Sequence, residues 1–141
     1  MSMSNLRMGF ILTGCLFWAG CGSSGPPLGD VRGKVTLDGK PVPRATLEFV
    51  TEGPGGSPSF GMTDKDGYYK LEFSQDKSGA LLGKHIVTIT TKKLSKDELP
   101  DDGRPIEEVA LELPKKFGQK GNLSAEVKSG SNTIDFPLES K

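Results

Sequence analysis

The chain contains few of the side chains that perform catalysis or bind metal ions. It has a single histidine, His85, and two cysteines, Cys15 and Cys21. A zinc site takes several nitrogen or sulfur ligands, and acid–base or nucleophilic catalysis needs a base with a partner that orients it. His85 stands beside Val87 and Ile89 in an alternating run, and no Gly-x-Ser-x-Gly motif occurs. We therefore expect His85 to be a partly buried structural residue, and we expect neither enzymatic activity nor a cofactor.

Two acidic segments carry the residue types of a cation site. Asp64-x-Asp66-Gly67 is similar to the start of a calcium loop, and Asp101-Asp102 form a second pair. A calcium loop of this kind ends in a bidentate glutamate, but the corresponding position here is Gln75. We therefore expect a solvated β-turn at the first segment, a hydrated loop at the second, and no bound metal.

The two cysteines lie in an N-terminal segment that differs from the rest of the chain. Arg7 is its only charged residue, and the uncharged run 8–18 and Ala19-Gly20-Cys21 follow. This is the layout of a signal peptide. The apolar run is about 11 residues long, whereas a membrane-spanning helix needs roughly 20. The pattern predicts a cleaved signal peptide over residues 1–20.

Ala19-Gly20-Cys21 resembles the lipobox of bacterial lipoproteins, in which the cysteine thiol receives a diacylglyceryl group and becomes the new N-terminus. The resemblance implies lipidation of Cys21. Trp18 departs from the family pattern, which prefers leucine there, and Leu12-Thr13-Gly14-Cys15 matches that pattern better. Cys15 is therefore an alternative site, although cleavage before it would leave Leu16-Phe17-Trp18 at the N-terminus. Cleavage before Cys21 exposes a flexible tether, residues 21–29.

The balance of charges excludes one class of partner, and the predicted anchor indicates where the protein acts. Lys and Arg number 18 and Asp and Glu also number 18, so no nucleic-acid partner is expected. Lipidation predicts a membrane-anchored lipoprotein of the bacterial cell envelope, facing the periplasm or the exterior. In some bacterial lipoproteins an aspartate after the lipidated cysteine marks retention in the inner membrane. Gly22 stands at that position here, so the resemblance favours the outer membrane. An ordinary secretory signal would instead leave a free thiol, which is unusual in a secreted protein.

Beyond residue 30 the chain shows period-two alternation, which is typical of half-buried strands. The apolar positions of the runs are Val31, Val35, Leu37, Leu47, Phe49, Tyr69, Leu71, Phe73, Val87, Ile89, Leu123, Val127, Ile134, Phe136 and Leu138. Polar residues and Tyr68 fall on the opposite faces. About seven short strands without a sustained helical period predict an all-β, antiparallel β-sandwich over residues 30–141.

Turn residues separate these runs. Asp38-Gly39 and Asp64-Lys65-Asp66-Gly67 predict hairpin or near-hairpin turns, and Ser129-Gly130-Ser131-Asn132 predicts a last hairpin between the strands through Val127 and Phe136. Residues 93–121 lack the alternation and form a long loop, in which 107–113 fits either a short helix or an edge strand.

Three motifs resemble the carboxypeptidase regulatory-like domain. The first is G-x-V-x-x-x-G-x-P-x-x-x-A at 33–45, the second T-D-x-D-G-x-Y at 63–69, and the third G-x-x-x-V-x-I at 83–89. The resemblance implies a transthyretin-like β-sandwich. In metallocarboxypeptidases this domain accompanies a separate catalytic domain, for which the chain is too short, so the resemblance implies no protease activity.

These observations favour a non-enzymatic, lipid-anchored envelope β-sandwich that acts as an interaction or structural module. Its partner would be an envelope protein or a glycan. The alternative is an extracytoplasmic domain that binds a small molecule or glycan through loops at one end of the sandwich. Exposed aromatic residues would favour that alternative, and self-association through a sheet edge stays open as a third possibility.

Overall fold

The computed structural model describes residues 25–92 and 112–141. Cys15, Cys21, the predicted signal peptide, Asp101 and Asp102 lie outside the described residues. The strands are β1 (Leu28–Leu37), β2 (Lys40–Pro41), β3 (Ala45–Thr51), β4 (Ser59–Met62), β5 (Tyr68–Lys70), β6 (Glu72–Ser74), β7 (Lys77–Ser78), β8 (Ala80–Leu81), β9 (Gly83–Thr91), β10 (Leu123–Val127), β11 (Ser131–Thr133) and β12 (Phe136–Leu138). A 3-10 helix, η2, spans Lys115–Gly118. No helix of the described part is long and apolar enough to span a bilayer.

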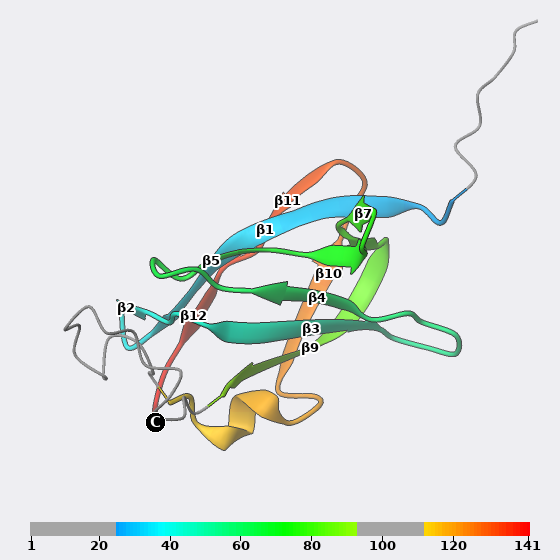
Figure 1. Cartoon of the computed structure of the whole chain (residues 1–141). Helices are drawn as coiled ribbons and strands as arrows, with labels where there is room; N and C mark the ends of the chain where they lie inside the picture. The colour runs from blue at the N-terminus through cyan, green and yellow to red at the C-terminus, as the bar shows by residue number, and fades with distance from the viewer. Residues whose placement is uncertain (1–24, 93–111) are drawn as a thin grey trace, which may run out of the picture.

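The strands form two sheets, as predicted (Figure 1). The first is built around β1, which pairs antiparallel with β2, β5 and β8 and parallel with β11 and β12. The second has the order β10-β9-β3-β4-β6-β7 and is antiparallel throughout. The prediction of an all-β, antiparallel sandwich is confirmed, and the two parallel pairings of β1 add to it.

The core lies between the inner faces of the two sheets. Phe49 of β3 is fully buried, and its ring centroid lies 6.5 Å from that of Tyr69 on β5 and 6.0 Å from that of Phe136 on β12. These rings come from both sheets and bind them together through apolar contact. The other buried apolar residues are Val31, Val35, Leu37, Val42, Ala45, Leu47, Leu71, Ala80, Val87, Ile89, Leu113, Phe117, Val127 and Leu138.

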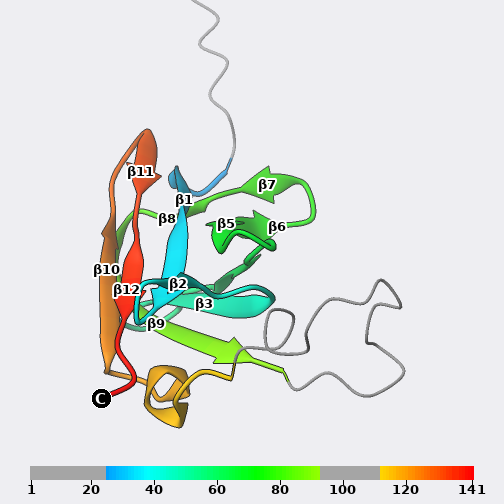
Figure 2. The same cartoon turned by 90° about the vertical axis from the view of Figure 1, so that its left-hand side faces the viewer.

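The predicted hairpin between the strands through Val127 and Phe136 is wrong. β10 pairs with β9, whereas β11 pairs with β1, so the turn connects the two sheets (Figure 2). The Asn132 side chain makes the backbone hydrogen bonds that a partner strand would otherwise make at Lys128. It accepts a hydrogen bond from Lys128 N (2.9 Å) and donates one to Lys128 O (2.7 Å). Asp30 N donates to Gly130 O (2.9 Å), which directs the chain towards β1.

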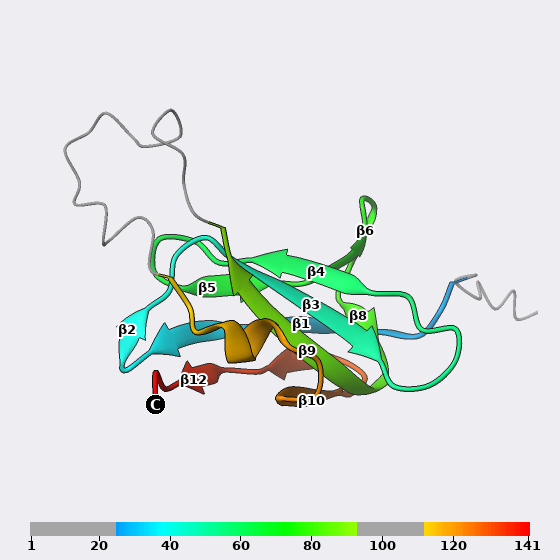
Figure 3. The same ribbon diagram turned by 90° about the horizontal axis from the view of Figure 1, so that it is seen from below.

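The boundaries of the sandwich differ from the expected ones at two places. β1 begins at Leu28, two residues before the expected start of the domain at Asp30. The end of the expected 93–121 loop is packed on the core, because Leu113 and Phe117 are buried and η2 lies against β9 (Figure 3). Leu113 N also donates to Thr91 Oγ1 of β9 (3.0 Å), so this segment closes one end of the sandwich.

Candidate binding groove

A groove of about 540 Å³ lies on the outer face of the first sheet, where β5 joins β1. The register places Lys34 opposite Tyr68 and Arg32 opposite Lys70. Period-two alternation explains this, since Val31 and Val35 point into the core, whereas Arg32 and Lys34 occupy the alternate, outward-facing positions. The groove is also lined by Met62, Asp64, Tyr69, Thr133 and Asp135. It therefore combines an exposed aromatic ring with three cationic side chains.

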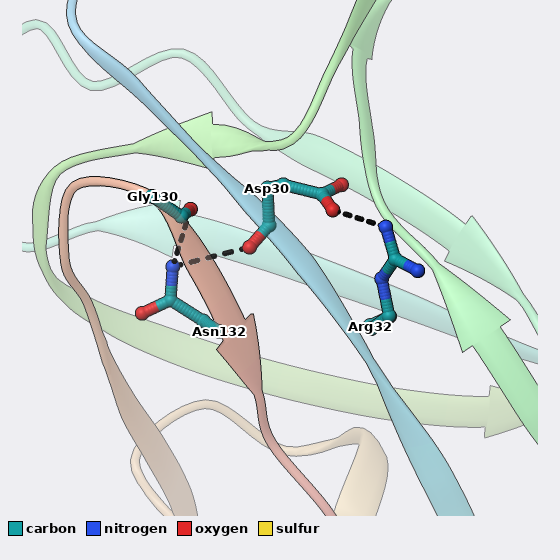
Figure 4. A network of polar contacts seen from close by, with 4 residues as sticks. All are labelled: Asp30, Arg32, Gly130 and Asn132. Atoms are coloured by element: carbon teal, nitrogen blue, oxygen red, sulfur yellow. Dashed lines mark hydrogen bonds and ion pairs between the residues drawn. The ribbon is translucent and has the colours of Figure 1, made fainter.

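The three cationic side chains of the groove differ in the groups that they contact. The Nζ atom of Lys34 lies 5.0 Å from the ring centroid of Tyr68, a cation–π contact. Arg32 and Lys70 stand directly opposite each other, an arrangement of like charges that is unfavourable in a sheet. Arg32 forms an ion pair with Asp30 next to the groove, shown with Asn132 and Gly130 in Figure 4. Lys70 is exposed, so its charge faces solvent.

The two carboxylates of the groove hold its backbone in place. Asp64 Oδ1 accepts hydrogen bonds from the N–H groups of Asp66 (2.9 Å) and Tyr68 (3.0 Å), and Asp135 Oδ1 accepts one from Lys34 N (2.8 Å). Asp64 therefore shapes an exposed turn, as predicted, but the turn joins β4 of the second sheet to β5 of the first, so the two strands do not pair as a hairpin. Within residues 25–92 and 112–141, no group of three or more His, Cys, Asp or Glu side chains is placed to hold a metal ion.

The floor of the groove is closely packed. The Tyr69 hydroxyl donates to Ile134 O (2.6 Å), and Ile134 N donates to Arg32 O (2.8 Å). Burial, with a smaller contribution from the Asp135 carboxylate, raises the pKa of Tyr69 above its ordinary value. A Cβ atom on Gly33 would lie 1.8 Å from Ile134 O, so only glycine fits at this position of β1. The floor is thus fixed by hydrogen bonds and by the absence of a side chain.

Three large apolar side chains are exposed around β4 and β5. Tyr68 is 54% exposed, Met62 63% and Phe60 49%. Tyr68 and Met62 line the groove, whereas Phe60 lies outside it, between Glu48 and Glu72 on the neighbouring strands. The alternation placed Tyr68 on a solvent face, but the sequence did not show that β5 lies beside β1. The exposure of Phe60 was also missed, because its run was too short to define an inner face.

His85 lies away from the groove, in β9 of the second sheet. It is fully buried, more so than predicted, with its ring centroid 5.8 Å from that of Phe49. Its Nδ1 donates to Gly83 O (3.0 Å), since a carbonyl oxygen only accepts, and the buried Nε2 has no hydrogen-bond partner in the described protein. Burial lowers the pKa of His85, and the bond to Gly83 opposes part of that effect. His85 is therefore a neutral core residue.

No protein-family model matches the chain, and no curated protein matches it. Among solved structures, a DUF3823 family protein from Parabacteroides merdae ATCC 43184 is similar, with 14% sequence identity and a TM-score of 0.43. The superposition covers 82% of this chain and 46% of that protein, so the chain spans less than half of its length.

Proposed function

We propose that the chain is a non-enzymatic bacterial lipoprotein whose β-sandwich is held at the cell envelope and binds a partner through the β1–β5 groove. The observation that carries this proposal is the groove itself. Tyr68 and Met62 are exposed beside Arg32, Lys34 and Lys70, on backbone fixed by Asp64 and Tyr69. A rigid site with an aromatic ring and a few polar groups is typical of recognition surfaces.

The anchor half of the proposal depends on the N-terminal sequence. The apolar run before Ala19-Gly20-Cys21 supports cleavage and lipidation at Cys21. Each buried methylene of an acyl chain contributes about 0.8 kcal/mol, so two or more chains would hold the protein on a membrane. The described domain begins a few residues later, at β1, and would therefore stay close to that surface.

A carboxypeptidase regulatory-like, transthyretin-like domain is part of the same proposal. Two of the three sequence motifs contain residues with clear structural roles, which supports it. Gly33 of the first motif leaves room for Ile134 O. Thr63 of the second motif hydrogen-bonds Val42 O and Ala45 N, both within the first. These roles support the proposed fold type, and a fold type by itself carries no catalytic chemistry.

The alternative expectation placed a ligand site in loops at one end of the sandwich. The groove instead lies on a sheet face, so the geometry favours that face as the binding surface. Its aromatic ring is the kind of feature that the alternative required. The proposal therefore includes recognition of a small ligand. It places the ligand site on the face of β1 and β5 and not in the loops.

The anchor is tested by intact mass and membrane partitioning of the natively produced protein. We expect the wild type to carry a diacylglyceryl-sized addition and to partition with membranes. Cys21→Ser should lose both properties, and the matched control Cys15→Ser should keep them. A soluble, unmodified wild type would refute the anchor, and a loss only in Cys15→Ser would move it to Cys15.

The binding surface is tested separately by cross-linking in intact envelopes. A photo-reactive residue at Met62 should capture a specific neighbour, whereas the same residue at Thr90, exposed on β9 outside the groove, should not. Equal capture from both positions, or capture from neither, would count against a groove partner.

A further inference from the structure

We infer that the β1–β5 groove binds a glycan, with a sugar ring against Tyr68 and its hydroxyl groups hydrogen-bonded by Lys34, Lys70 and Asp135. The inference rests on the proposed function, because it names the chemical class of ligand for the same groove. Its evidence is the combination of exposed apolar surface, mixed polar groups and fixed backbone at one place.

The apolar part of the groove fits the face of a sugar ring. Tyr68 is 54% exposed and Met62 63%, and both line the same hollow. Exposed apolar side chains gathered in a groove mark an interaction site, because water there is readily displaced by an apolar surface. The C–H face of a pyranose offers such a surface, and an aromatic ring contacts it over a wide area at little conformational cost.

The polar part of the groove contains both donors and acceptors. Lys34, Lys70 and Arg32 can only donate hydrogen bonds, whereas the carboxylates of Asp64 and Asp135 only accept them. A hydroxyl group both donates and accepts, so a ligand rich in hydroxyls can satisfy both kinds of group. Asp135 is exposed, and the bond from Lys34 N engages one of its two oxygens, so the carboxylate has further capacity to accept.

The same lining disfavours an acidic peptide. Its carboxylates would meet Lys34 and Lys70, but they would also meet Asp64 and Asp135, which carry the same charge. A peptide cannot add as a strand to β1 either, because Arg32 already pairs with Lys70 on one side and Thr133 on the other. A hydroxyl-rich chain meets neither obstacle.

The groove is also ordered before any ligand arrives. Asp64 holds the Tyr68 N–H, Asp135 holds the Lys34 N–H, and the Tyr69 hydroxyl fixes Ile134 beneath them. Lys34 contacts one part of the Tyr68 ring, and the ring is still 54% exposed, so a sugar would contact the part that Lys34 leaves open. Preorganisation of this kind reduces the entropy lost on binding, so a shallow site can still be specific.

The experiment measures glycan binding by the full-length protein extracted in detergent. An array of polysaccharides comes first, followed by calorimetric titration with the neutral xylo- and cello-oligosaccharides as defined probes. We expect at least one of these to bind, and Tyr68→Ala to weaken the binding by about tenfold, the loss expected for one aromatic contact. The matched control is Phe60→Ala, which removes a ring of similar exposure outside the groove and should leave binding unchanged.

Three results would overturn the inference. The first is an array without binding above background, and the second is equal weakening by Tyr68→Ala and Phe60→Ala. The third is tighter binding of an acidic peptide, titrated in parallel, than of every glycan, which would assign the groove to a protein partner. None of these results depends on the anchor, because loss of Cys21 lipidation alters membrane partitioning and leaves binding by the extracted protein intact.

Discussion

Thr63→Val tests whether a single buried hydroxyl ties together two turns of the sandwich. Thr63 is 3% exposed and follows the end of β4. Its Oγ1 donates to Val42 O (2.6 Å), in the connection between β2 and β3, and accepts from Ala45 N (2.8 Å), at the start of β3. Valine keeps the branched shape of threonine but can make neither bond, so the substitution removes the hydrogen bonding and little of the packing.

The expected magnitude follows from what the hydroxyl leaves behind. Ala45 N–H and Val42 C=O are both buried, and an unsatisfied buried group costs about 1–3 kcal/mol. The methyl group of valine recovers less than about 1 kcal/mol through apolar burial. We therefore expect the free energy of unfolding to fall by about 2–4 kcal/mol. A domain of this size is stable by about 5–15 kcal/mol, so the variant should still fold.

Urea denaturation followed by far-UV circular dichroism is the suitable assay, because the only tryptophan, Trp18, lies in the predicted signal peptide. The control is Thr46→Val, which changes an exposed residue of β3 in the same sheet and should stay within about 0.5 kcal/mol of the wild type. If the two variants unfold at the same urea concentration, the Thr63 hydroxyl does not hold the turns, and the reasoning is refuted.

Two further predictions concern the polar side chains of Asn132 and His85. Asn132→Asp places a carboxylate oxygen where Nδ2 now faces Lys128 O (2.7 Å) and Asp30 O (3.1 Å). It should therefore destabilise the fold by more than Asn132→Ala in the same assay, and the opposite order would contradict this account of the turn. Burial lowers the pKa of His85, so below pH 6.5 the unfolded chain binds a proton that the folded chain does not. Stability of the wild type should consequently fall with pH below 6.5 more steeply than that of His85→Leu, and equal slopes would refute the assignment.

The faces of the strands could be predicted from the sequence because burial in a sheet has a period of two residues. Val31, Val35, Phe49 and Phe136 are all buried, as the alternation indicated. The Asp38-Gly39 turn was also predictable, since both residues adopt the positive φ values, 49° and 82°, that a tight hairpin requires. Each of these features depends only on residues close together in the chain.

The pairing of strands could not be predicted, because it depends on contacts between distant residues. A turn sequence such as Ser129-Gly130-Ser131-Asn132 specifies a reversal of direction, but it does not specify which sheet receives the next strand. The groove was missed for the same reason. Tyr68 and Lys34 were both expected on solvent faces, yet only the register between β5 and β1 shows that they share one.

The groove also contains the one cross-strand pair described above that folding alone would not favour. Arg32 and Lys70 stand opposite each other, and an acidic residue at either position would stabilise the sheet. Asp30 compensates the charge of Arg32, but Lys70 faces solvent beside the exposed Tyr68 and Met62. Residues that break a local rule in an otherwise consistent fold are candidates for functional positions. The unfavourable Arg32–Lys70 pair and the exposed Tyr68 and Met62 side chains lie at one site. This coincidence is the physical reason to look for the ligand on this face of the sandwich.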